Sequence, residues 1–381
     1  MLLATTAAVG DSGDLFALNV GVSKKHDDNL FKRPADGSRG ALDSDNSTST
    51  QLDLSLNKQF SLQRVAVKLG LTDTRYQTFK TLDSRNDNHS ASWQWQFTPQ
   101  LTGNLSATRS QAQTDFADFR GGGQNTNTTE TKRLDGNWQI MGGWNLGAGA
   151  SRTKSVNSQT FQQNDSSDQR IADANLTYKF TSGSSIALLT STSRGEQLRA
   201  ADPVTLRDNR FQERRSDLKL NWPITGKTTL TGGVGNVRRT HDTFSARDYS
   251  GSNGDASLNW AATAETRFTF IRSRATESWE ETNSNFSIRD LTGLSASWTI
   301  TPKVSVAASL NRTRLSFGGD IPGLPTNSRL DRTQTRSLGI NWAPHTKIKL
   351  GASISDDRRE STLVSTDYRS KTAMLTGSIE F

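Results

Sequence analysis

The side chains that most often carry catalysis are few and scattered in this sequence. Its four histidines, His26, His89, His241 and His345, do not have the spacing of metal ligands. The chain contains no cysteine, and it has no HExxH, P-loop or nucleophile-elbow motif. The glycines at 121–123 are not followed by a helical pattern, so they form a flexible loop and not a phosphate cradle. We therefore expect no enzyme, no cofactor and no metal site.

The charge of the chain raises nucleic-acid binding as an alternative, because the formal net charge is +8. The basic residues are spread along the whole sequence beside acidic ones, which argues against that reading. Only 32% of the 381 residues are hydrophobic, and no run approaches the ~18 apolar residues of a spanning helix. A membrane β-barrel gives no such run, since only alternate residues of its strands face lipid.

An aromatic residue ends an alternating segment about every 40 residues, a spacing that indicates a structural repeat. The set is Phe60, Phe97, Trp138, Phe180, Trp222, Trp260, Trp298, Trp342 and Phe381. In residues 90–97 apolar and polar side chains alternate, and residues 217–222 and 337–342 repeat the pattern. Alternation with a period of two is typical of a strand with one apolar and one polar face.

Short connections with turn chemistry follow the aromatic residues. Examples are residues 98–100, 142–143, 181–183, 301–303 and 343–345. A second alternating strand then leads into a longer polar segment. Nine such units of two strands give 18, the first near 15–25 and the last near 369–381. The pattern predicts an all-β fold, a transmembrane antiparallel up-and-down β-barrel with short periplasmic turns and longer extracellular loops.

The two ends of the chain carry signals of export. Residues 1–13 resemble the remnant of a secretory signal without its basic region, so residues 14–381 are expected to form a single outer-membrane barrel. Near the other end, Ala373, Leu375, Gly377, Ile379 and Phe381 share one face. This pattern resembles the C-terminal signal read by the barrel insertion machinery, which is therefore an expected partner.

Counting in steps of two from the aromatic residues assigns charged side chains to the lumen. The candidate substrate path is Arg64, Lys68, Arg133, Lys179, Arg215, Asp217, Lys219, Asn259, Arg267, Lys347 and Lys349. Such a wall is polar, of mixed sign and slightly basic, and it offers hydrogen-bond partners to a sugar chain. Any water-filled barrel interior would have the same character, which is the simpler reading.

The same counting places a series of arginines on the lipid-facing register, near the outer rim of the apolar band. The set is Arg109, Arg152, Arg194, Arg238, Arg312 and Arg358, with Arg75 and Arg274 at similar heights. There they would contact outer-membrane lipid and bind the phosphates of lipopolysaccharide. A solvated rim is one alternative. A β-bulge that turns these side chains into the lumen is another.

The segment 20–34 resembles the opening of a known family. Asp27, Asp28, Asn29, Leu30 and Phe31 match an Asp-Asp-Asn-Leu-Phe-Arg-like stretch, with Lys32 where arginine is usual. The stretch is similar to that of exosortase-associated outer-membrane β-barrel proteins of exopolysaccharide biosynthesis. The resemblance implies export of a secreted exopolysaccharide, with periplasmic export partners. The residues themselves would cap the first strand and gate the pore, bind a cation or sugar, or simply end a strand.

We therefore expect an outer-membrane channel that exports an exopolysaccharide without catalysis. A general diffusion porin and a structural or adhesive barrel with a plugged lumen are the alternatives. A loop folded into the pore would favour selectivity, and residues 120–129 and 317–331 are the candidates.

Overall fold

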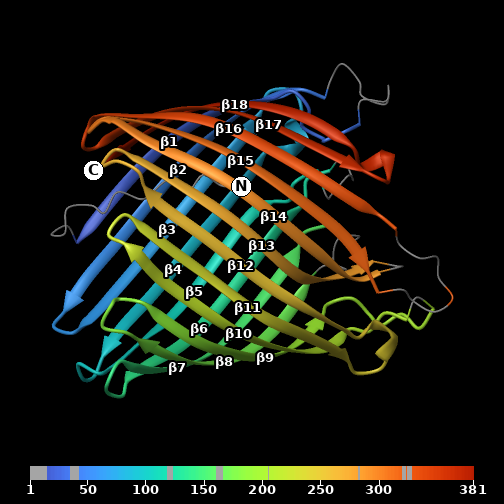
Figure 1. Cartoon of the computed structure of the whole chain (residues 1–381). Helices are drawn as coiled ribbons and strands as arrows, with labels where there is room; N and C mark the ends of the chain where they lie inside the picture. Colours follow the sequence, from blue (N-terminus) through green and yellow to red (C-terminus); the bar gives the residue numbers. More distant parts are fainter. Residues whose placement is uncertain are drawn as a thin grey trace.

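The computed structural model describes residues 15–34, 43–117, 123–159, 166–204, 206–281, 284–319, 323 and 328–381. The predicted leader remnant at 1–13 lies outside these residues. Within them, 18 strands form one antiparallel sheet in which every strand pairs with its neighbours in the chain (Figure 1). The last strand also pairs with the first, so the sheet closes into the predicted barrel.

The strands have the following bounds. They are β1 Phe16–Asp27, β2 Asp45–Phe60, β3 Gln63–Tyr76, β4 Ser84–Gln96, β5 Leu101–Gln113, β6 Thr126–Gln139, β7 Trp144–Asn157, β8 Ser167–Lys179, β9 Ser185–Gln197, β10 Arg210–Thr225, β11 Thr228–His241, β12 Tyr249–Ala261, β13 Thr266–Glu281, β14 Ser284–Thr301, β15 Val304–Gly318, β16 Leu330–His345, β17 Ile348–Ser361 and β18 Tyr368–Glu380. Three short 3-10 helices, η1 Lys80–Leu82, η3 Ser245–Arg247 and η4 Val364–Thr366, lie in described connections. None of the described helices is long and apolar enough to cross a bilayer.

The two ends of the barrel differ as the sequence predicted. At the left of Figure 1 the strands join through short turns, and at the right through longer connections. The turn expected at 343–345 is placed differently, because β16 continues through a bulge to His345 and turns at 346–347. One outer connection is also short, since β13 ends at Glu281 and β14 begins at Ser284. Short turns mark the periplasmic end and longer loops the extracellular end.

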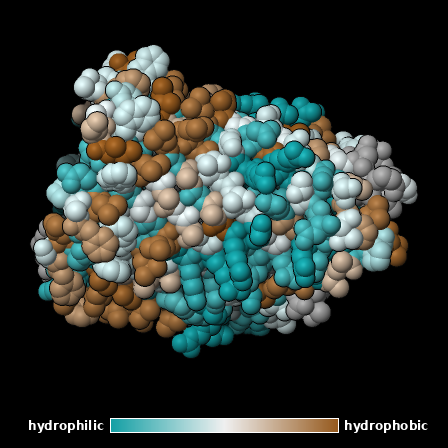
Figure 2. Space-filling model, turned by 90° about the horizontal axis from the view of Figure 1, so that it is seen from below, coloured by the Kyte–Doolittle hydropathy of each residue, from teal (hydrophilic) through white to brown (hydrophobic). Residues whose placement is uncertain are grey.

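The outer face of the barrel carries the apolar side chains. Leu69, Leu188, Leu294, Leu338 and Ile354 are all exposed, as a lipid-facing surface requires. On the face shown in Figure 2, apolar residues gather mainly toward the turn end and polar residues toward the loop end. On this face the apolar side chains therefore lie toward the periplasmic end and the polar ones toward the extracellular end.

Candidate functional site: the lumen wall and its mouth

Strand pairing fixes which side chains face the lumen, because residues directly opposite each other on neighbouring strands lie on one face. Leu54 on β2 is paired with Leu69 on β3, and both are exposed to the outside. Arg64 and Lys68, an odd number of positions from Leu69, therefore lie on the inner face. The same parity holds from strand to strand around the sheet.

The structure brings the predicted lumen residues onto this inner register. They are Arg64 and Lys68 on β3, Arg133 on β6, Lys179 on β8, Arg215, Asp217 and Lys219 on β10, Asn259 on β12, Arg267 on β13 and Lys349 on β17. Lys347 lies in the turn before β17. Their role as a substrate path stays a prediction.

Hydroxyl and amide side chains form much of the inner wall between these charges. They hydrogen-bond to each other across strands, as Ser309 Oγ does with Ser337 Oγ at 2.7 Å. Likewise Thr269 Oγ1 donates to Asn259 Oδ1 at 2.8 Å, and Thr131 Oγ1 lies 3.1 Å from Thr153 Oγ1. A hydroxyl has donor and acceptor capacity beyond one such bond, so the wall can still bind water or sugar hydroxyls.

Two pairs of opposite charge lie in the middle of the wall. Arg133 donates from Nη1 and Nη2 to the two carboxylate oxygens of Asp173, at 2.7 and 3.0 Å. This bidentate contact reaches from β6 across β7 to β8, and a fork-to-fork pair of this kind is among the stronger polar contacts. Lys219 on β10 likewise pairs with Asp255 on β12, across β11. The central lumen is therefore polar with its charges largely balanced.

The periplasmic end of the wall is more basic. Arg64, Lys179, Arg267 and Lys349 each lie within two residues of the periplasmic end of a strand. Lys349 Nζ lies 4.0 Å from a carboxylate oxygen of Glu380. Among the described residues, Arg64, Lys179 and Arg267 have no carboxylate within 4.0 Å. An anion approaching from the periplasm would meet these cations first.

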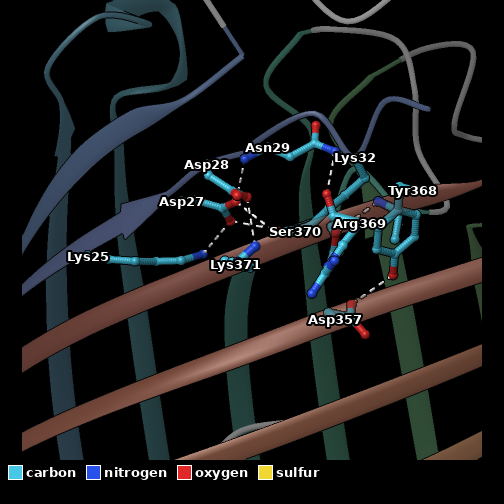
Figure 3. Close-up of polar contacts among 12 residues, drawn as sticks. Lys25, Asp27, Asp28, Asn29, Lys32, Asp357, Tyr368, Arg369, Ser370 and Lys371 are labelled. Carbon is cyan, nitrogen blue, oxygen red and sulfur yellow. Dashed lines mark hydrogen bonds and ion pairs between the residues drawn. The ribbon is translucent and has the colours of Figure 1, made fainter. Parts of the chain in front are cut away.

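The motif at 27–31 lies at the extracellular mouth, where the first and last strands meet (Figure 3). Asp27 is only 2% exposed and ends β1. Its carboxylate accepts hydrogen bonds from Ser370 Oγ at 2.7 Å and from Lys32 Nζ at 3.1 Å. The carboxylate of Asp28 accepts from the Lys371 N–H at 2.7 Å. Both acidic residues therefore bind β18.

Asn29 continues this seam between the two ends of the chain. Its Nδ2 donates to the backbone oxygens of Arg33 and Arg369, each at 2.9 Å, and the side chain is fully buried. Lys32 takes a left-handed backbone conformation with φ 52° and bonds Ser370 Oγ at 2.7 Å. Such a conformation is unfavourable for lysine, so these contacts must hold it in place. Of the three readings of the motif, the contacts favour a structural strand end that fastens the barrel closure.

Leu30 and Phe31 form an apolar cluster at the mouth. Both are buried with Leu82 and Phe116, and Tyr76 and Phe79 pack against them. The ring of Phe31 makes edge contacts with Phe79 at 4.7 Å and with Phe116 at 5.0 Å between centroids. Apart from Tyr76, the last residue of β3, these residues come from the connections after β1, β3 and β5, so the cluster ties three outer loops together.

The connection between β5 and β6 folds inward. The backbone oxygen of Ala117 accepts a hydrogen bond from Nη1 of Arg359, at 2.9 Å, on the inner register of β17. Strands β18 and β1 to β4 separate these two residues around the barrel. The loop predicted at 120–129 belongs to this connection, although residues 118–122 lie outside the described part. In the other candidate, 317–331, residues 320–322 and 324–327 lie outside it.

Sequence reasoning missed Phe116 and Arg359, since neither stands in a motif. The alternation within β17 does place Arg359 on the inner face, which was the one available signal. No pattern in the sequence indicated that a loop backbone would reach it.

The predicted outer arginines lie on the lipid-facing register, and no bulge turns them inward at their positions. Arg109 pairs with Asp87 at 3.3 Å and with Glu130 at 3.0 Å. Arg152 pairs with Asp168 at 2.5 Å, and Arg358 with Glu360 at 2.8 Å. Arg194, Arg238 and Arg312 have no ion pair among the described residues. Their contact with lipopolysaccharide stays a prediction.

Metal chemistry gains no support from the described residues, which contain no group of three or more histidine and acidic side chains able to hold an ion.

Residues 220–381 match a family model described as "Putative beta-barrel porin 2". No curated protein matches the sequence. Among solved structures, OccK2 (OpdF) of Pseudomonas aeruginosa aligns with a TM-score of 0.58 at 11% identity, over 96% of this chain and 98% of that one. OccK9 (OpdG) of the same organism aligns with a TM-score of 0.55 at 10% identity, over 96% and 98%. This chain is a porin-like barrel of the outer membrane.

A third structure, OpdK of P. aeruginosa with vanillate, aligns with a TM-score of 0.55 at 10% identity, over 96% of this chain and 99% of that chain. At such low identity the likeness shows the fold alone. It confirms the predicted closed antiparallel barrel and, with the family model, the outer-membrane location. The matched family model is described as a porin, and the resemblance to the exosortase-associated proteins stays a prediction.

Proposed function

We propose that this barrel is an outer-membrane conduit for hydroxyl-rich chains and that it exports an exopolysaccharide without catalysis. The observation that carries the proposal is the inner wall, where hydroxyls and amides alternate with charge pairs such as Arg133–Asp173 and Lys219–Asp255. A barrel of 16 to 18 strands is wide enough for an aqueous channel. Sugar hydroxyls can exchange hydrogen bonds along such a wall.

The cations at the periplasmic end support an anionic substrate entering from that side. Arg64, Lys179 and Arg267 would raise the local concentration of a polyanion at the entrance. The outward direction rests on the resemblance of residues 27–31 and on periplasmic export partners, which remain part of the proposal.

A general diffusion porin is the second candidate, and the match of residues 220–381 to a porin family favours it. Both functions need an open lumen, whereas a structural or adhesive barrel does not. The inward contact of Ala117 with Arg359 favours a narrowed mouth and hence selectivity over free diffusion.

Single-channel recording in planar bilayers tests the proposal. We expect polygalacturonate oligomers added on the periplasmic side to block the current at lower concentration than dextran oligomers of equal length. A double variant, Lys179→Gln with Arg267→Gln, should raise the blocking concentration of polygalacturonate about tenfold and leave the dextran response unchanged.

The matched control is Lys154→Gln with Arg170→Gln, which removes two cations from the outer register of β7 and β8. It should leave blockade unchanged. An equal response to both polymers would indicate a general porin. A barrel that inserts without conducting would indicate a plugged or structural barrel.

A further inference from the structure

The outer face of β13 to β17 carries a pocket rich in arginine, above the apolar band. Its volume is about 440 Å³. It is lined by Arg272, Asp290, Thr292, Arg312, Thr313, Arg314, Arg332, Thr333, Gln334, Arg358 and Glu360. We refer to these residues as the arginine pocket. Five arginines face two carboxylates there, so the pocket has an excess of positive charge.

Strand register arranges most of these side chains in two rows across five neighbouring strands. The lower row is Arg272, Thr292, Arg312, Gln334 and Arg358, and the upper row is Asp290, Arg314, Arg332 and Glu360, with Arg274 beside the pocket at the same height. Directly below the lower row lie Phe270, Leu294 and Leu310 on the same face. On β13 to β15 the arginines therefore begin where the apolar side chains end, whereas on β16 and β17 the row of Leu310 continues with Arg336 and Asp356.

The height of the pocket agrees with a headgroup position. Arg312 follows the first residue of β15, Val304, by eight positions, which corresponds to about 20 Å above the turn for a tilted strand. The apolar band of such barrels is about 25 Å tall. Because the long loops lie beyond it, the pocket faces the outer leaflet.

The upper row places two like charges opposite each other. Arg314 is paired directly with Arg332, and like charges directly opposite each other destabilise a sheet. On their other sides the register places Asp290 opposite Arg314 and Glu360 opposite Arg332. Among the described residues neither arginine, nor Arg312, has a carboxylate within 4.0 Å. By contrast Arg272 and Arg274 share Asp290, at 3.5 and 3.9 Å, and Arg358 has Glu360.

We propose that the arginine pocket binds a phosphate group of lipid A in the outer leaflet, with Arg312, Arg314 and Arg332 as its ligands. Guanidinium groups bind phosphate oxygens through two parallel N–H donors, and basic pockets at membrane height bind anionic headgroups. The apolar residues below the pocket would contact the acyl chains. This proposal is independent of what the lumen conducts.

The test is native mass spectrometry of the purified folded barrel, titrated with bisphosphorylated lipid A and with the same lipid lacking both phosphates. We expect the wild-type barrel to bind the bisphosphorylated lipid at least about tenfold more tightly. Equal binding of the two lipids would overturn the proposal, whatever the variants show. Equal binding of phosphatidylglycerol would overturn the assignment to lipid A.

The location is tested with Arg314→Gln combined with Arg332→Gln. The double variant should lose about tenfold in affinity for bisphosphorylated lipid A. The control, Arg75→Gln with Arg109→Gln, also removes two outer-register arginines, but each of these is paired with carboxylates. A loss confined to the control would place the lipid site elsewhere and refute the pocket. Single Arg332→Gln serves if the double variant does not fold.

Discussion

At the scale of single residues, the barrel closure depends on a small buried polar group. Asp27 and Lys32 have side chains only 3% and 10% exposed, and both bind Ser370 on the last strand. An ion pair removed from water is costly to break from one side, because the remaining charge stays buried. The motif at 27–31 is thus tied to the stability of the seam through these contacts.

Replacing Lys32 with methionine should lower the free energy of unfolding by about 2–3 kcal/mol, since Asp27 would keep its charge without its nearest buried cation. Urea unfolding in lipid vesicles, followed by the loss of heat-modifiable mobility, measures the change. Lys25→Met is the control, because Lys25 also pairs with Asp27 but is 42% exposed. It should cost less than about 1 kcal/mol. Equal losses in the two variants would contradict the buried pair.

At the scale of elements, alternation along each strand separates lipid from lumen. On β16, Leu338 is exposed on the outer face, and its neighbour Ser337 bonds Ser309 inside. A shift of one position moves every side chain of a strand to the other face. The strand register therefore decides both insertion and the chemistry of the wall.

The substitution Leu338→Arg should lower the free energy of unfolding of the barrel in vesicles by about 2–4 kcal/mol, because it would place a charge in the apolar band. The substitution Ser337→Arg should leave the free energy of unfolding nearly unchanged and reduce conductance, because the arginine would extend into the lumen. Vesicle unfolding and bilayer recording distinguish the two. If Ser337→Arg were the more damaging to folding, the assigned faces of β16 would be wrong.

At the scale of the whole molecule, the order of the strands around the barrel places opposite charges side by side on the inner wall. Arg133 meets Asp173 and Lys219 meets Asp255, in each case across an intervening strand. A lumen whose central charges are paired should select weakly between small ions. The basic entrance then acts on larger polyanions without making the pore strongly anion-selective.

Asp255→Asn would release Lys219 and should shift the reversal potential in a KCl gradient toward anion selectivity by several millivolts or more. Asp168→Asn is the matched control, since Asp168 lies on the outer register of β8 and pairs with Arg152. The same change of net charge there should leave the reversal potential where it was. A shift in both variants would mean that net charge alone, and not the lumen, sets selectivity.

Much of the architecture could be read from the sequence because its signal is local. Alternation, terminal aromatic residues and turn chemistry each act within a few residues, so they gave the 18 strands and their faces. Even the turn near His345 was displaced by only a few residues. How far the strands extend at their extracellular ends was harder to predict, because the polar side chains beyond the membrane show no alternation with apolar ones.

The sequence by itself determined the class of fold, the membrane and the parity of each strand, since period-two patterning permits one apolar face and one wet face. Only the tertiary structure decided what the motif at 27–31 contacts, which loop reaches Arg359 and which arginines share a pocket. Those contacts join residues separated by up to 343 positions, as Asp27 and Ser370 are. Closure of the sheet creates the contacts of the motif and of Arg359, whereas the pairing of the consecutive strands β13 to β17 gathers the arginines.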